Sequence, residues 1–160
     1  METAIFWPLQ SNIIRAGKTN NTFGMVRKNG DGTAKPHQGW DFAASVGTPA
    51  YAIVNGVVEF VRDKGDYGLQ VCLAFDFNGE KLYAFYAHLN KSYVKQGDDV
   101  KGNDLIVICG KSGNAANLAK AEDHLHFEIR TKATPGLGLK DRVSPIMVFK
   151  KCPLTIAIPG

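Results

Sequence analysis

Two short histidine patterns supply the residue types that a catalytic metal site needs. The first places His37 four residues before Asp41, and the second is the pair His124 and His126. Catalytic zinc takes three protein ligands from histidine and carboxylate side chains and leaves one position for water. Zinc also lowers the pKa of that water to about 7, so hydroxide exists at neutral pH. The two patterns together therefore predict a hydrolytic metal centre.

The second pattern lies in a segment, residues 124–130, that alternates polar and apolar side chains. Side chains two apart in a strand share a face, so His124 and His126 would stand side by side, opposite the core. The core-facing set would be Leu125, Phe127 and Ile129. Such a pair alone also fits two polar residues on a solvated strand face. The pattern therefore gains weight only beside His37 and Asp41.

The remaining histidine, His88, stands at the end of an aromatic run, residues 83–89. On its own it fits a hydrogen-bonded histidine at a strand end. Histidine titrates near the working pH, so a histidine beside a metal site can also shuttle protons or donate to an oxyanion. His88 is thus a candidate only if the chain brings it to the metal centre.

Short apolar runs alternate with turn residues from Thr48 onward, which is typical of a mainly antiparallel β domain. An Asn-Gly pair between apolar runs is a strong hairpin signal. The predicted strands are two around Asn55-Gly56 within residues 51–63, then residues 69–75, 81–89, 104–109 and 124–130. The predicted helices are residues 115–122, from their Ala, Leu, Lys and Glu content, and a short one opened by Ser144-Pro145. The strand spacing leaves sandwich and open barrel as alternatives.

The composition predicts one soluble globular domain over residues 1–160. Apolar residues make up 44% and charged residues 21% of the chain. A chain of this length can bury a hydrophobic core without the help of disulfides or a structural metal. No stretch approaches the roughly 18 apolar residues of a membrane span. The net charge of +4 favours anionic partners in general. Without a Lys/Arg block, we expect a solvated surface, no nucleic-acid partner and a monomer.

The three cysteines, Cys72, Cys109 and Cys152, are far apart and form no CxxC pair. A cysteine zinc site is therefore not expected. Buried free thiols are a better interpretation than one disulfide with a spare cysteine.

The motifs resemble, in order, those of the M23 peptidases, the lysostaphin and LytM type of peptidoglycan endopeptidase. The matching segments are HQGWDFA (37–43), GTPA (47–50), NGVV (55–58), YAHL (86–89), VKQGDDVKG (94–102), GKSG (110–113) and HLHFE (124–128). They cover about residues 37–130, which leaves 1–36 as an N-terminal extension and 131–160 as a C-terminal tail. The fold that the resemblance implies is a compact antiparallel β sandwich with an active-site groove and few short helices.

The resemblance also implies a role for each site residue. His37, Asp41 and His126 would bind Zn²⁺. His88 and His124 would orient or activate the water and steady the tetrahedral intermediate. The implied substrates are stem or cross-bridge peptides of peptidoglycan, so the protein would act in the periplasm or cell wall.

Two other functions are alternatives to the enzyme. A catalytically silent module of the same family would bind and activate another wall hydrolase, but such modules typically lose zinc ligands, whereas this chain has the full set. A structural zinc site would be four-coordinate and rich in cysteine, and no cysteine lies near these motifs. We therefore expect an active peptidase.

Two features depart from the family pattern. Ten residues, 114–123, separate Gly113 from His124, about twice the expected number, and they hold the predicted helix 115–122 at the rim of the groove. Trp40 stands where a smaller aliphatic residue is usual, and we expect it to pack in the core.

The N-terminal residues have no basic region, apolar stretch or small-residue cleavage site, and so do not resemble a secretory signal. We therefore hypothesise a toxin that a secretion system delivers into rival bacteria, with a cognate immunity protein that plugs the groove. A phage lysis enzyme and a trimmed fragment of a secreted hydrolase are the alternatives.

Overall fold

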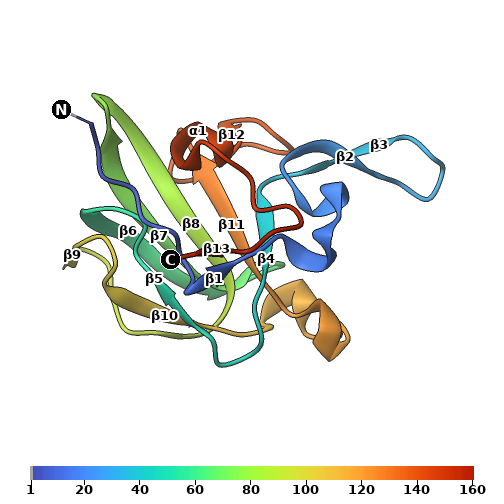
Figure 1. Cartoon of the computed structure of the whole chain (residues 1–160), viewed down its shortest axis with the longest axis horizontal. Coiled ribbons are helices and arrows are strands. Elements are labelled where there is room, and N and C mark those ends of the chain that lie inside the picture. Colours follow the sequence, from blue (N-terminus) through green and yellow to red (C-terminus); the bar gives the residue numbers. More distant parts are fainter. Residues whose placement is uncertain (1) are drawn as a thin grey trace.

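The computed structural model describes residues 2–160, and most of its regular structure is antiparallel strand (Figure 1). The strands are β1 (Ser11–Asn12), β2 (Gly24–Lys28), β3 (Ala34–His37), β4 (Trp40–Ala43), β5 (Pro49–Tyr51), β6 (Gly56–Lys64), β7 (Gly68–Phe77), β8 (Glu80–Ser92), β9 (Asp99–Val100), β10 (Leu105–Cys109), β11 (His124–Arg130), β12 (Arg142–Val143) and β13 (Ile158–Pro159). The helical segments are short: 3-10 turns η1 (Arg15–Gly17), η2 (Thr19–Asn21), η3 (Gly113–Ala115) and η4 (Lys120–Glu122), and helix α1 (Ile146–Phe149). The mainly β prediction is confirmed.

One large sheet organises the molecule, in the order β12-β11-β8-β7-β6-β9. Strand β4 pairs with β11, and β10 pairs with both β5 and the end of β8. The predicted hairpin forms between β7 and β8, where Asn78 and Gly79 both take positive φ values, as a tight two-residue hairpin turn requires. Tyr86 of β8 accepts a hydrogen bond from the Ile53 amide and donates one to the Tyr51 carbonyl. These bonds tie the segment after β5 to the face of the sheet.

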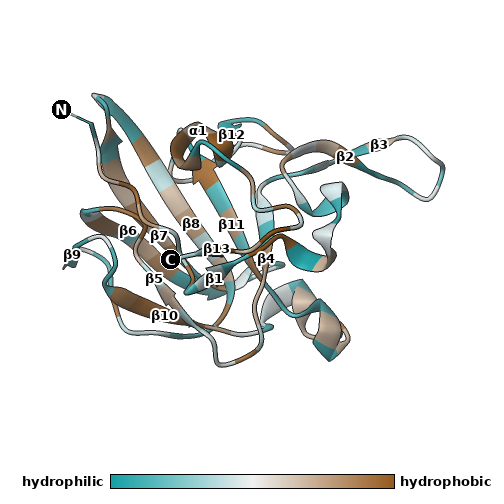
Figure 2. Cartoon of the chain, in the orientation of Figure 1, coloured by the Kyte–Doolittle hydropathy of each residue, from teal (hydrophilic) through white to brown (hydrophobic). Residues whose placement is uncertain are grey.

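The core lies on one face of β11 and its neighbours. Leu125, Phe127 and Ile129 are all fully buried in it, as the alternation along residues 124–130 predicts. Figure 2 shows the same alternation as brown and teal bands along β8 and β11. Trp40 is also in the core, as predicted, with its ring stacked on Phe149.

Both terminal segments contribute to this core. Leu9 and Ile14 from the N-terminal extension are buried in it, as are Val148 and Phe149 from the C-terminal tail. Trp7 stacks on Phe149 with ring centroids 4.3 Å apart. The residues before 37 therefore pack as part of the same body that carries the metal-site motifs.

The predicted helix over residues 115–122 is wrong. The 3-10 turn η3 ends at the first residue of the segment, Ala115, and η4 begins at Lys120, with Ala119 before it in an extended conformation. An isolated helix this short is marginal in water, and here tertiary bonds compete with it: the Asn114 amide donates to Asp66, and the Lys111 ammonium donates to Leu118. Helix propensity alone could not show these partners.

One other element differs in detail from the prediction, and one agrees with it. Only one strand, β6, adjoins Asn55-Gly56, because the strand before it, β5, ends at Tyr51 and pairs with β10 instead. The short helix after Ser144-Pro145 is present as α1.

Within residues 2–160, Cys72, Cys109 and Cys152 are free thiols, the first two buried and the third half-buried. No helix among these residues is long and apolar enough to cross a membrane.

Candidate metal centre

The two histidine patterns meet because β4 and β11 are paired. In this register Asp41 lies directly opposite His126, and both side chains point away from the core. His37 ends β3, one tight corner before β4. That corner needs glycine, because a Cβ at Gly39 would collide with the carbonyl oxygen of Phe127 on β11. The chain therefore brings His37 back over the same face as Asp41 and His126.

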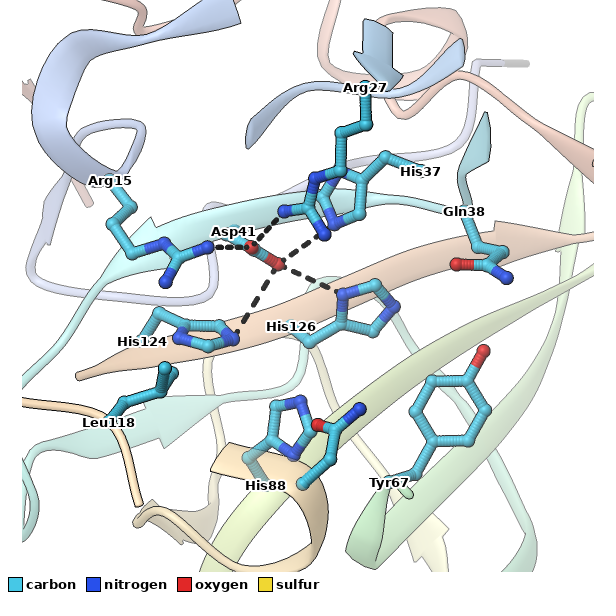
Figure 3. A pocket seen from close by; sticks show the side chains of 11 residues that line it. Arg15, Arg27, His37, Gln38, Asp41, Tyr67, His88, Leu118, His124 and His126 are labelled. Carbon is cyan, nitrogen blue, oxygen red and sulfur yellow. Dashed lines mark hydrogen bonds and ion pairs between the residues drawn. The ribbon is translucent and has the colours of Figure 1, made fainter. Parts of the chain in front are cut away.

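The three side chains form a compact, buried cluster (Figure 3). Their candidate ligand atoms all lie within 4.8 Å of one another. Asp41 Oδ1 is 3.2 Å from His37 Nε2 and 2.9 Å from His126 Nδ1. Two imidazole nitrogens and one carboxylate oxygen are a typical donor set of catalytic zinc, which keeps a fourth position for water. His37, Asp41 and His126 therefore fit such a metal ion.

Backbone carbonyls orient three of the four histidines. A carbonyl oxygen only accepts, so Nδ1 must donate in each contact: His37 to Thr22 at 2.8 Å, His88 to Ser112 at 2.8 Å and His124 to Glu122 at 2.9 Å. When the ring is neutral, this bond holds its one proton on Nδ1, and Nε2 carries none. In each neutral ring, Nε2 is therefore the atom available to a metal or a substrate.

His88 and His124 complete the group that the sequence predicted. Their ring centroids are 5.1 Å apart, and His124 Nε2 is 3.8 Å from Asp41 Oδ1. His88 has a φ of 59°, unusual for a non-glycine residue. Such strained conformations tend to gather at functional sites, and this one lies where β8 leaves β11 and turns to pair with β10. The structure thus places all five predicted site residues in one pocket.

Burial sets the protonation of these two histidines. It lowers the pKa of His88 to about 4, with a further contribution from the neighbouring His126 and His124 charges. Burial also lowers the pKa of His124. Both rings are therefore neutral at pH 7 and can accept a proton.

His126 behaves in the opposite way before a metal binds. Burial disfavours its charged form, but hydrogen bonds to Asp41 and Glu128 outweigh this and raise its pKa to about 9. Burial also opposes the charged form of Asp41, yet hydrogen bonds from His126 and His37 hold the pKa of that carboxyl well below its usual range. The metal-free centre is thus an ion pair between His126 and the carboxylates.

Sequence reasoning missed a buried network behind His126. Glu128 Oε2 lies 2.7 Å from His126 Nε2 and accepts the Tyr67 hydroxyl at 2.8 Å. Glu128 Oε1 accepts from Arg130 at 2.7 Å and from Arg142 at 2.8 Å. Glu128 thereby fixes the tautomer that leaves Nδ1 of His126 for a metal, the usual task of a carboxylate behind a histidine ligand. Its position two residues after His126 was the available signal.

Two arginines that the sequence also did not single out contact Asp41 from the other side. Arg15 Nη2 and Arg27 Nη2 donate to Asp41 Oδ2 at 2.9 and 3.1 Å. They come from η1 and β2, and neither sits in a motif. The cavity over the cluster has a volume of about 270 Å³. Its lining residues are Arg15, Arg27, His37, Gln38, Asp41, Tyr67, His88, Asn114, Leu118, His124 and His126. Asn114 and Leu118 place the segment 114–123 at its rim, as predicted.

Comparison with known proteins decides the family. Residues 35–136 match the family model described as Peptidase family M23. The chain belongs to this peptidase family. An uncharacterized metalloprotease of Haemophilus influenzae is 35% identical over 156 residues, which are 96% of this chain and 27% of that protein. The DD-carboxypeptidase/endopeptidase Mpg of Neisseria meningitidis is 34% identical over 121 residues, 76% of this chain and 24% of Mpg.

The fold agrees with this M23 assignment. A zinc-containing peptidase from Vibrio cholerae superimposes with a TM-score of 0.63 and 28% identity, covering 87% of this chain and 39% of that one. The chain spans about a quarter of the length of the curated relatives named above. Arg15, Arg27 and Arg142 lie outside the residues that match the M23 model.

Zinc binding to this M23 centre should release about one proton at pH 6. His126 is protonated there, because its pKa is about 9, and it must lose the Nδ1 proton to become a ligand. Apparent affinity should rise about tenfold per pH unit and level off as the pH passes that pKa. Titration calorimetry in two buffers of different ionisation enthalpy counts the protons. At pH 6 zinc-bound water, with a pKa of about 7, mostly keeps its proton and adds little to the count. If the binding enthalpy of zinc were the same in both buffers, no proton would be released, and the assignment of a charged His126 would be wrong.

Proposed function

We propose that this chain is a zinc-dependent endopeptidase that hydrolyses peptide cross-links or stem peptides of bacterial peptidoglycan. One observation carries the proposal: His37, Asp41 and His126 present two nitrogens and one oxygen within 4.8 Å at the base of a cavity. The chain's similarity to known proteins supports it, since Mpg is a DD-carboxypeptidase/endopeptidase and the Vibrio cholerae neighbour is a zinc-containing peptidase.

His37, Asp41 and His126 would hold the metal, which when bound supplies a water of lowered pKa and a Lewis acid for the scissile carbonyl. His88 and His124 would do the proton transfers. Both are neutral at pH 7, with Nε2 free of backbone contacts. A neutral imidazole accepts a proton from the attacking water and then, once charged, donates to the tetrahedral oxyanion or the leaving nitrogen.

The outer contacts keep this arrangement rigid. Glu128 holds the ring of His126, and Arg15 occupies Oδ2 of Asp41 so that Oδ1 is the oxygen left facing the histidines. Burial, with the Glu128 charge, raises the pKa of Tyr67 to about 12. Its hydroxyl therefore stays protonated and remains a donor to Glu128.

Digestion of purified peptidoglycan tests the proposal. Zinc-loaded protein should release peptide fragments from at least one of several chemotypes, a chelator should stop the release, and added zinc should restore it. Mass spectrometry of the fragments identifies the bond. Absence of cleavage in every chemotype would refute the enzyme and favour the silent module that activates another wall hydrolase.

We further propose that the protein acts in the periplasm or cell wall, as a delivered antibacterial toxin or a phage lysis enzyme. If it is a toxin, a cognate inhibitor protein would fill the cavity over the metal centre. The location follows from where peptidoglycan lies. Expression in the cytosol should be harmless, whereas directed export should lyse the cells, and export of a His126 variant is the control. Harmless export of the active protein would refute the toxin.

A further inference from the structure

Two guanidinium groups contact the same carboxylate oxygen of Asp41, although one would be enough to hold it in place. Arg15 and Arg27 both donate to its Oδ2 (Figure 3). Arg15 is the closer and more buried of the two, at 2.9 Å and with 15% of its side chain exposed. It also donates to Asn21 at 2.8 Å. Arg15 alone therefore fixes this oxygen, and the second guanidinium needs another explanation.

Arg27 is placed differently. Its side chain is 30% exposed and lines the cavity. Its Nε donates to the Asn20 carbonyl, and its Nη2 is shared between Asn21 and Asp41 at 3.1 Å each. Among residues 2–160, no protein atom accepts a hydrogen bond from Nη1 of Arg27. One arm of the fork is thus free beside the metal cluster.

The charges around the cavity also favour the binding of an anion. Its lining holds two arginines and, among residues 2–160, a single carboxylate, that of Asp41. The nearby Glu128 does not alter this, because Arg130 and Arg142 already neutralise it. A bound divalent cation would add two more positive charges. An arginine fork with a free arm is well suited to a carboxylate.

We propose that Arg27 binds a free carboxylate on the residue that follows the scissile bond. The inference rests on the proposed peptidase function and specifies its substrate. Arg27 Nη2 lies 3.1 Å from the metal-ligand candidate Asp41, so only a carboxylate close to the scissile carbonyl can reach it. A residue before the bond that has a single carboxyl group, such as alanine or glycine, has used it in that bond. The nearest free carboxylate therefore belongs to the residue after it.

This choice selects a class of peptidoglycan bond. A substrate of a carboxypeptidase carries such a carboxylate by definition, and so does a direct cross-link in which the acylated amine sits on an amino-acid α-carbon with a free carboxyl group. An internal bond of a glycine bridge carries none. Arg27 would thus direct the enzyme to stem-peptide bonds and away from glycine bridges.

A matched pair of substrates tests the inference. Two stem peptides ending in D-Ala–D-Ala, one a free acid and one a C-terminal amide, are compared with a cross-linked pair whose leaving residue is likewise free or amidated. Wild type should prefer the free carboxylate by about 10- to 100-fold in kcat/KM, the range for a hydrogen bond to a charged group. In Arg27→Gln the preference should fall to about one. Arg62→Gln, which removes an arginine stacked on Phe60 outside the cavity, should keep it.

Zinc affinity, measured by competition with a chromophoric chelator, separates this role from support of Asp41. Arg27→Gln should bind zinc as wild type does, because Arg15 remains on Asp41. An equal loss on acid and amide, with weaker zinc binding, would overturn the inference and make Arg27 a positioning residue. A wild type without preference, or one that digests peptidoglycan but cleaves neither pair, would also overturn it while leaving the proposed function intact. If the zinc-loaded protein cleaved no peptidoglycan at all, both the inference about Arg27 and the proposed peptidase function would be refuted.

Discussion

His126→Ala should lose zinc binding and activity together. His126 is one of only three side chains in the candidate donor set, and its Nδ1 lies 2.9 Å from Asp41. With two ligands left, the variant should not retain stoichiometric zinc. Activity should drop by about 10³-fold or more, since a catalytic metal supplies several kcal/mol of stabilisation. Metal analysis of the dialysed protein and kcat/KM on peptidoglycan fragments measure both effects.

The fold should survive this substitution, because both carboxylates keep other partners. Asp41 retains Arg15 and Arg27, and Glu128 retains Arg130 and Arg142. Thermal unfolding provides an internal check. Zinc at 100 times its Kd stabilises a protein that binds it by about 2.7 kcal/mol, so zinc should raise the Tm of wild type but not of the variant.

His124→Ala is the matched control, since that histidine stands two residues away on the same strand face. It should keep zinc and lose rate. A fully zinc-loaded His126→Ala would show that the ligand assignment is wrong.

The strand that carries His124 and His126 could be predicted because its signal is local. A period of two along residues 124–130 places polar and apolar side chains on opposite faces, and burial of Leu125 in the core confirms it. The hairpin at Asn78-Gly79 was predictable for the same reason, since the turn residues themselves fix the geometry. Patterns that depend only on neighbours in the sequence can be recognised without a structure.

The outer contacts of the site could not be predicted in this way. Arg15 and Arg27 reach Asp41 across 26 and 14 residues of chain, and arginine is so common on surfaces that neither position stands out. Only the path of η1 and β2 over the metal face brings them there. The failed helix over residues 115–122 shows the same limit, because Asp66 binds the preceding residue, Asn114, and Lys111 binds the Leu118 carbonyl, and helix propensity does not reveal either contact.

His88→Ala should keep the metal and lose most of the rate. His88 lies outside the three-residue donor set, and its ring centroid is 6.0 Å from that of His126. Removal of a positioned acid-base group should lower kcat/KM by about 10²- to 10⁴-fold. Zinc affinity should be unchanged, which distinguishes this variant from His126→Ala.

The backbone at this position calls for a second variant. Residue 88 has a φ of 59°, which alanine adopts less readily than asparagine does. Loss of the ring also leaves the Ser112 carbonyl without its donor. His88→Asn tolerates the conformation and its amide can donate to Ser112, yet it has no titratable group. If both variants lose rate equally, the missing function is proton transfer rather than the fold of the strand. Wild-type activity in His88→Asn would remove His88 from the mechanism and leave His124 as the only histidine outside the donor set that is available for proton transfer.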